Sequence, residues 1–485
     1  MVLHTSCDNG FEELNIDPTT ANEIDPNFQM TWVQLRTSGG RYENWRASLI
    51  YSSTMMQHFA TTCGYWSGDK YSYNGGYSSS LFDRAYTEQV KDIQDLINTL
   101  ETTDGADQTM LGMAKIWRVV IFHRLTDLYG DIPYFQAGKA FLEGIDFPEY
   151  DAQEVIYADM LEELEEGIAL LPNGTGFGGA DLIYAGDADK WKRFGYSLML
   201  RLAMRLSEAD AGTAQAWVAK AVAGGVMQSN DDIAFIQHTD GDGINRNGIG
   251  EVLDKEKGAD TCPRLSNTLV DWMMGTGDPR LDIFGETPIN GGAHKGLPNG
   301  LDETTIQDNP TGTSTDDFSS YNGLIVTVAS PMFFQTYAET QLLMAEAIKR
   351  GWADGSAEER YNNGVRAAMQ QWEVYDASLA VDDATVDAYL AANPYADSFE
   401  QIGWQYWAAT FLNEYETYAN WRRTGYPTLT PVNYMNNVTG GQIPSRMMYP
   451  ESEIGLNPNL DAALARQGMS TDFSNEMTVP VWWDK

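Results

Sequence analysis

The spacing of apolar residues along the chain predicts helices rather than strands. In residues 187–207, apolar side chains recur every three or four positions, as on the buried stripe of an α-helix. The stripe consists of Trp191, Phe194, Leu198, Leu202 and Leu206. The basic residues of this segment fall outside the stripe, and we expect them on the surface. They are Lys192, Arg193, Arg201 and Arg205.

The predicted helices follow one another as hairpins. A helix over residues 336–350 ends at Gly351, and the next helix opens at a capping box between Ser356 and Glu359. The same alternation pairs 81–100 with 109–129, and 151–171 with 187–207. Such pairs resemble tetratricopeptide hairpins, which bury their apolar faces only against neighbouring hairpins. We therefore expect a stacked helical scaffold.

Long irregular segments lie between the predicted helices. They are rich in Gly, Ser, Asp, Asn or Pro and cover residues 62–80, 230–259, 286–323 and 433–484. Loops longer than about 15 residues inside a compact domain are usually functional. No change in composition marks a linker, so we expect one large unit, a helical scaffold that carries these loops.

Composition adds a strong acidic charge to this picture. The chain has 485 residues, of which 43% are hydrophobic, as in ordinary globular proteins. Its 31 Lys and Arg residues face 69 Asp and Glu residues, which gives a formal net charge of −38. Such a charge repels nucleic acid and anionic lipid, so we expect neither as a partner. No apolar run reaches the length of about 18 residues that a membrane-spanning helix needs.

Three cysteines lie far apart, at positions 7, 63 and 262, without metal-ligand spacing. Cys63 and Cys262 can pair in an oxidising compartment, and the alternative is two separate buried thiols. Cys7 loosely matches the end of a bacterial lipoprotein signal, with Leu3 one place too far upstream. The basic and apolar regions of a signal peptide do not precede it. From these residues alone, an unpaired terminal thiol fits equally well.

Signatures of catalysis and metal binding are missing. The sequence has no HExxH, GxSxG or P-loop motif, and the GxGxxG match at 174–179 follows a helix rather than a strand. The acidic loop at 240–245 carries Ile244 at a ligand position of an EF-hand. His123 lies among apolar residues and is expected in the core. We expect no catalytic residue, no metal site and no cofactor.

Aromatic residues crowd into the polar loop at 62–80, namely Tyr65, Trp66, Tyr71, Tyr73 and Tyr77. Aromatic faces beside short polar side chains suit sugars, because the CH face stacks while polar groups bind the hydroxyls. We take Trp66 as the first stacking ring, with Tyr71, Tyr73 and Tyr77 in support. The alternative is that two or three of these rings fill space between the loop and the core.

A second wall of this binding site is expected in the segment 286–323, at Tyr321 and Asn322. Both residues lie in a loop with few apolar side chains.

Segments spread along the chain carry a resemblance to a known family. They are Cys7–Pro18, Ala114–Arg118, Leu125–Tyr134, Asp181–Tyr184, Lys190–Phe194, Leu200–Ser207, Ser330–Pro331, Tyr337–Glu339, Ala345–Ala347, Asn420–Pro427, Tyr449–Glu453, Asn457–Asn459 and Val481–Trp483. In this order and spacing, they resemble the SusD/RagB-like surface lipoproteins of Bacteroidetes, in particular the SusD-like type 2 branch. The resemblance covers nearly the whole chain.

The resemblance implies a mainly α fold, a tetratricopeptide-like helical scaffold whose long irregular loops form a ligand-binding half. It implies that residues 1–24 are a lipoprotein tether, lipidated at Cys7, and that residues 25–485 are a single SusD-like domain. It further implies an outer-membrane, cell-surface location. There, a non-catalytic protein captures poly- or oligosaccharide and delivers it to a SusC-like TonB-dependent barrel.

Other readings remain open from the sequence. One is a peptide-binding lipoprotein of the same build. A second is a secreted glycoside hydrolase or lyase, which needs a placed pair of carboxylates. A third is a helical-repeat scaffold for protein partners only, which does not need the long loops. We also expect Arg422 and Arg423 to pair with carboxylates that lock the scaffold.

Overall fold

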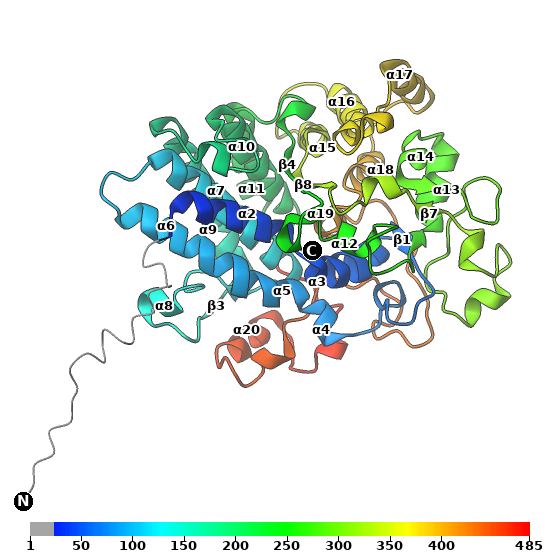
Figure 1. The fold of residues 1–485 in the computed structure, drawn as a ribbon, viewed down its shortest axis with the longest axis horizontal. Coiled ribbons are helices and arrows are strands. Elements are labelled where there is room, and N and C mark those ends of the chain that lie inside the picture. The colour runs from blue at the N-terminus through cyan, green and yellow to red at the C-terminus, as the bar shows by residue number, and fades with distance from the viewer. Residues whose placement is uncertain (1–23) are drawn as a thin grey trace, which may run out of the picture.

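A computed structural model describes residues 24–485, so Cys7 and the expected tether lie outside the described residues (Figure 1). The described part is built mainly from helices, with a few short strands. No helix in residues 24–485 combines the length and the apolarity needed to cross a lipid bilayer.

The scaffold consists of long helices that pack on their neighbours. They are α6 (Lys91–Thr102), α7 (Gln108–Tyr129), α9 (Gln153–Leu170), α10 (Ala188–Arg205), α11 (Ala211–Gly224), α15 (Tyr337–Lys349), α16 (Ala357–Gln370), α18 (Phe399–Ala409) and α19 (Glu414–Thr424). Helix α7 packs between α6 and α9, α10 packs between α9 and α11, and α15 packs against α16 and α18. The expected series of stacked hairpins is therefore present.

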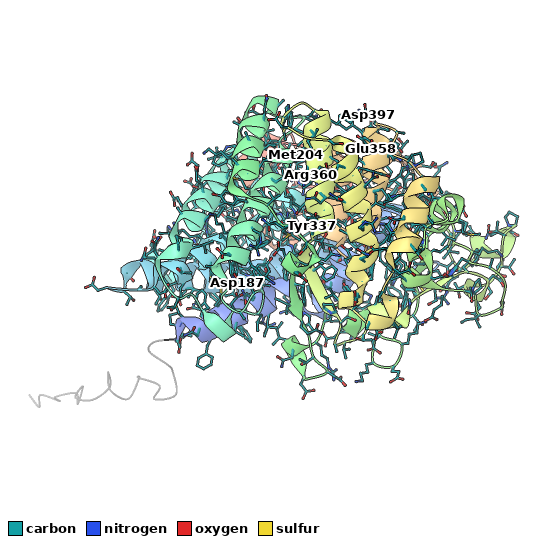
Figure 2. All side chains as sticks on the ribbon, turned by 90° about the horizontal axis from the view of Figure 1, so that it is seen from above. Asp187, Met204, Tyr337, Glu358, Arg360 and Asp397 are labelled. Atoms are coloured by element: carbon teal, nitrogen blue, oxygen red, sulfur yellow. A yellow bond between two sulfur atoms is a disulfide. The ribbon has the colours of Figure 1, made fainter. Side chains whose placement is uncertain are left out.

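Local sequence sets where these helices begin and end. The Asp187 side chain accepts a hydrogen bond from the backbone of Lys190 at the start of α10, and Ser356 caps α16 in the same way. Figure 2 shows that α10 runs from Asp187 up to Met204, and that α16 begins near Glu358, on the side of the molecule where α10 ends. Gly351, with φ of 76°, follows the end of α15 as expected.

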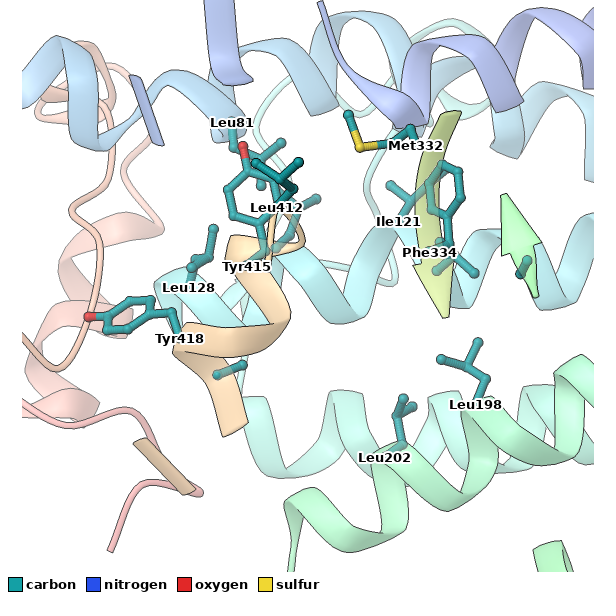
Figure 3. Close-up of a cluster of buried hydrophobic side chains, with 14 of the residues drawn as sticks. Leu81, Ile121, Leu128, Leu198, Leu202, Met332, Phe334, Leu412, Tyr415 and Tyr418 are labelled. Carbon is teal, nitrogen blue, oxygen red and sulfur yellow. The ribbon is translucent and has the colours of Figure 1, made fainter. Parts of the chain in front are cut away.

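The core forms where helices from distant parts of the chain meet (Figure 3). All five residues of the predicted stripe on α10 are at most 2% exposed. Leu198 and Leu202 of this stripe share the core with Ile121 of α7 and with Phe334 of a strand, β8 (Pro331–Gln335).

Two arginines of α10 lie inside the protein rather than on its surface, so their predicted exposure was wrong. Arg201 donates two hydrogen bonds to Glu339 of α15, at 2.6 and 2.7 Å. Arg205 donates to both carboxylate oxygens of Glu416 on α19, at 2.8 and 2.7 Å. Each arginine is at most 3% exposed. Paired carboxylates from other helices make this burial tolerable.

The pair Arg422–Arg423 gives a mixed result. Arg423 forms the expected ion pair, with both guanidinium nitrogens 2.6 Å from the Glu346 carboxylate. Arg422 instead donates to the backbone oxygen of Ser445 and lies over the Tyr418 ring, 4.0 Å from its centre. It forms no ion pair with a carboxylate of residues 24–485, so that half of the expectation was wrong.

The short strands were not predicted. They are β1 (Phe59–Ala60), β2 (Ile132–Pro133), β3 (Tyr150–Asp151), β4 (Ala234–Gln237), β5 (Arg264–Leu265), β6 (Gly285–Glu286), β7 (Ser320–Tyr321) and β8. They form the antiparallel pairs β1–β5, β2–β3, β4–β8 and β6–β7. Six of the eight strands have only two residues, which leave no alternation for a pattern to detect. Strands β4 and β8, with four and five residues, pair with each other across about 95 positions of sequence.

The remaining helices surround the scaffold and the loops. They are α2 (Pro26–Ser38), α3 (Arg41–Glu43), α4 (Gly75–Ser78), α5 (Ser80–Ala85), α8 (Ala140–Glu143), α12 (Gly250–Leu253), α13 (Asn267–Thr276), α14 (Arg280–Phe284), α17 (Asp383–Ala392) and α20 (Leu460–Gln467), with π-helical stretches η1 (Asn44–Ser53) and η3 (Tyr86–Val90). Helix α20 lies in residues 433–484, where only irregular structure was expected.

Candidate functional site

The loop at 62–80 sends its two central rings into the core. Trp66 and Tyr71 are both 0% exposed. The indole of Trp66 donates to Asp260 at 2.8 Å, and the phenol oxygen of Tyr71 accepts from the backbone of Val432 at 3.0 Å. A ring with no exposed surface cannot stack on a ligand. The burial contradicts the choice of these two rings as stacking platforms and supports the alternative that they fill space under the loop.

The other two chosen rings of the loop are partly exposed but point to different places. The Tyr73 hydroxyl donates to Glu451 at 2.7 Å, which ties it to the C-terminal segment. The Tyr77 ring, on α4, faces the guanidinium of Arg46, 5.6 Å from its centre. The four chosen rings therefore do not form one surface.

The predicted second wall lies close to the same loop. Tyr321 is only 2% exposed, and its hydroxyl donates to the backbone oxygen of Asp260 at 3.4 Å. Asn322 is partly exposed, but its side chain accepts from the backbone of Leu324 at 3.0 Å and so stabilises a turn. These contacts place Tyr321 below the surface and leave Asn322 at its edge.

A residue that the sequence gave no reason to choose, Asp260, organises this region. One oxygen of its buried carboxylate accepts three hydrogen bonds, from the indoles of Trp45 and Trp66 and from the hydroxyl of Tyr65, at 3.0, 2.8 and 2.8 Å. Of these rings, Tyr65 is 44% exposed. It meets Trp45 edge-to-face, with 6.2 Å between ring centres. Asp260 thus holds two accessible rings beside each other at the surface.

A disulfide joins Cys63 to Cys262, with 6.0 Å between their Cα atoms. This finding decides between the two alternatives left open for these cysteines. The bond links the loop at 62–80 to the segment that carries Asp260, across 199 positions of sequence. The disulfide therefore holds the loop with Tyr65 and Trp66 close to the carboxylate that binds both side chains.

An open cleft of about 400 Å³ lies next to Trp45, and we call it the arginine cleft. Its lining residues come from the end of α2, from α3, from the start of η1 and from α5 and η3. They are Arg36, Gly40, Arg41, Tyr42, Glu43, Trp45, Arg46, Arg84 and Glu88. Figure 1 shows α3 and α5 beside each other near the centre of the molecule.

A sharp turn between α2 and α3 brings these residues together. Helix α2 ends at Ser38 and is followed by Gly39, which has φ of 82°, a backbone conformation that glycine adopts without steric cost. A Cβ atom at this position would lie 2.7 Å from the side chain of Asn44. The turn places Arg36 and Arg41 on the same cleft, although they belong to different helices.

Guanidinium groups lie over aromatic rings throughout the arginine cleft. Arg46 and Arg84 lie over Tyr42, 3.7 and 4.9 Å from the ring centre, and Arg41 lies 4.8 Å from the centre of Trp45. Such contacts are favourable cation–π interactions. The cleft therefore combines flat apolar surfaces with hydrogen-bond donors.

The two acidic residues of the cleft differ in their environment. Glu88 pairs with Arg36 at 2.9 Å and with Arg84 at 2.7 Å. Glu43 is only 4% exposed, and burial raises its pKa to about 7 even though the backbone of Gly40 donates to it at 2.8 Å. At neutral pH, Glu43 is therefore only partly charged.

The described residues show no candidate metal site, and the histidine singled out from the sequence lies in the core. Within residues 24–485, His, Cys, Asp and Glu side chains nowhere gather in a group of three that could hold a metal ion. His123 is 2% exposed, and burial lowers its pKa to about 4, which confirms the predicted core histidine. Its partner Asp127 lies in the scaffold, 3.3 Å away.

The stacked helical hairpins define a tetratricopeptide-like scaffold, and its open cleft lies among α2, α3 and α5 and the stretches η1 and η3. Residues 18–450 match a SusD-like family described as starch-binding and associating with the outer membrane. The chain therefore belongs to the SusD-like family, whose members are binding proteins, and the resemblance seen in the sequence is confirmed.

Solved structures share this fold along almost the whole chain. A chitin-binding protein has 33% sequence identity and a TM-score of 0.85, over 95% of this chain and 100% of its own. A SusD homologue from Bacteroides uniformis has 23% identity and a TM-score of 0.79, over 96% and 100%. A chitin-binding SusD homologue from Flavobacterium johnsoniae has 24% identity and a TM-score of 0.78, over 95% and 97%. No curated protein sequence matches the chain.

Proposed function

We propose that this protein is a non-catalytic glycan-binding lipoprotein of the cell surface, and that it holds poly- or oligosaccharide at the arginine cleft. The observation that carries this proposal is the group of accessible rings there. Tyr42 and Trp45 line an open hollow of about 400 Å³, and Tyr65 extends the aromatic surface beside it. This volume lies within the usual range of ligand sites, about 300–1,000 Å³.

The chemistry of the cleft suits a sugar better than it suits an apolar ligand. Ring faces stack on the CH groups of a pyranose, and nearby guanidinium groups donate to its hydroxyls. The chitin-binding relative at 33% identity and the starch-binding description of the family support a glycan ligand. Of the binding residues chosen from the sequence, Tyr77 lies next to the cleft, because its ring contacts Arg46, which lines the cleft. Trp66 and Tyr321 support the neighbouring aromatic surface from below, because both donate hydrogen bonds to Asp260. Tyr71 lies elsewhere, at the segment that contains Val432.

The cellular role follows from the family. We propose that residues 1–24 tether the protein to the outer membrane through a lipid on Cys7, with residues 25–485 as the folded domain. Further acyl chains are needed beside the first, because one chain anchors weakly. In this position the protein delivers its glycan to a SusC-like TonB-dependent barrel. The family's association with the outer membrane supports this location.

Calorimetric titration tests the glycan site. The probes are maltooligosaccharides, chitooligosaccharides, marine and plant polysaccharides, and oligopeptides. We expect a glycan to bind, and we expect Trp45→Ala to weaken that binding at least about tenfold, as for a ring that anchors a ligand.

The matched control is Trp217→Ala, which removes a partly exposed ring from α11, on the scaffold. We expect it to leave affinity unchanged. Binding of oligopeptides alone would favour the peptide-binding alternative. Release of reducing ends from a bound glycan, abolished by one carboxylate substitution, would favour a hydrolase.

A further inference from the structure

The arginine cleft concentrates positive charge in a chain that has little of it. Four arginines line it, Arg36, Arg41, Arg46 and Arg84, although the whole chain has only 31 basic residues against 69 acidic ones. The cleft contains two carboxylates, and one of them, Glu43, is only partly charged at neutral pH. Its local charge is therefore opposite in sign to the charge of the protein.

The guanidinium groups of two of these arginines have no acidic partner among residues 24–485. Arg36 and Arg84 both pair with Glu88. In contrast, the guanidinium groups of Arg41 and Arg46 form no ion pair with any carboxylate of residues 24–485, although the backbone N–H of Arg41 donates to the Glu251 carboxylate at 3.2 Å. Their guanidinium groups are held by rings instead, Arg41 over Trp45 and Arg46 over Tyr42.

Among residues 24–485, neither guanidinium donates a hydrogen bond to an oxygen atom. The N–H donors along the edge of each group are therefore available. That edge matches two acceptor oxygens of a carboxylate or sulfate, and such charge-assisted pairs are stronger than bonds to neutral hydroxyls. A neutral sugar bound here would remove water from these cations without supplying an opposite charge, and this desolvation costs binding free energy.

We propose that Arg41 and Arg46 bind an acidic group of the glycan, the carboxylate of a uronic acid or a sulfate ester, while the sugar ring stacks on Trp45 or Tyr42. This inference rests on the proposed glycan site and adds the substrate class to it. It also assigns the roles within the cleft. The rings supply contact area, the two unpaired arginines select for charge, and Glu88 holds the other two arginines in place.

Calorimetric titration with matched sugars tests the inference. The acidic probes are a short oligogalacturonate and a short sulfated galactan oligosaccharide, which separate carboxylate from sulfate. The neutral probe is the same oligogalacturonate with its carboxyl groups methyl-esterified. The titrations are run at about 0.15 M salt, where a Debye length of about 8 Å screens the repulsion between the acidic protein and the probe.

We expect at least one acidic probe to bind about tenfold or more tightly than the ester. Arg41→Gln and Arg46→Gln should each reduce this preference several-fold while leaving the weaker binding of the ester in place. The control is Arg366→Gln, which makes the same charge change on α16, where Arg366 pairs with Asp383. It should leave the preference unchanged, and melting curves should show that all the variants are folded.

The outcomes separate the inference from the proposed function. Equal binding of acid and ester overturns the inference and leaves the glycan site intact. If neutral glycans bind and both acidic probes fail to bind, the inference is also overturned and the glycan site is again left intact. An acid preference that survives both arginine substitutions also overturns it. If no glycan of any kind binds, the proposed function itself fails.

Discussion

Replacement of Glu43 by glutamine should stabilise the protein above pH 7 and have little effect near pH 4. Glu43 is 4% exposed in the arginine cleft, and burial raises its pKa from an ordinary 4.5 to about 7. The folded state therefore holds a proton more tightly than the unfolded state does. The stability that this carboxyl contributes is present below pH 4.5 and is lost as the pH rises to about 7.

The size of the effect follows from the pKa difference. A rise of about 2.5 corresponds to about 3 kcal/mol, because each pKa unit is worth about 1.4 kcal/mol. A glutamine keeps an oxygen that can accept from the backbone of Gly40 but never takes on the buried charge. We expect Glu43→Gln to raise the free energy of unfolding at pH 8 by up to about 3 kcal/mol. For a chain of this length, that is about 3 °C in melting temperature.

Melting curves of the variant and the parent between pH 4 and pH 8 measure this difference, and other titrating groups cancel in the comparison. The matched control is Glu88→Gln, which removes the same charge from the same cleft. Since Glu88 pairs with Arg36 and Arg84, its loss should not stabilise the protein at any pH. A difference between Glu43→Gln and the parent that stays constant across this pH range would refute the reasoning.

Three further changes test other parts of the structure. Trp66→Ala removes a fully buried ring and should cost about 3–5 kcal/mol of stability while glycan affinity stays the same; the reverse pattern in melting and titration experiments would place Trp66 at the ligand. Arg205→Met removes the nearer of two cations from the buried Glu416, with Arg201 remaining 3.5 Å away, and should cost about 3 kcal/mol, the lower end for a broken buried pair; unchanged denaturation curves would show that the ion pair contributes nothing. Cys7→Ala in the full-length precursor, expressed in its own host, should leave the membrane fraction; retention there would mean that the barrel partner anchors the protein.

Periodicity predicted the helical scaffold because each helix has a local pattern. The stripe on α10 is buried as expected. The same pattern misplaced Arg201 and Arg205, because their carboxylate partners belong to helices that lie more than a hundred residues away in the chain. Apolar spacing shows which side of a helix faces the core, but it does not show when a charged group finds a partner there.

The candidate site was harder to predict for a related reason. Trp66 and Tyr65 are neighbours in one polar loop, yet one is buried and the other is 44% exposed. Their shared partner, Asp260, lies almost two hundred residues further along the chain. A usable signal was nevertheless present. Arg36, Arg41 and Arg46 follow one another at five-residue intervals among aromatic residues, in a chain with few cations.

The hydrogen bonds of Asp260 have a consequence for the entropy of binding. Trp45 and Tyr65 donate to the same buried oxygen, so their rings are already held in one orientation before a ligand arrives. Ordering a mobile side chain at a binding site costs about 0.5–1.5 kcal/mol, and here that ordering is completed during folding. Asp260→Ala should therefore weaken glycan binding without removing any group that touches the sugar. The loss should appear mainly as a less favourable binding entropy.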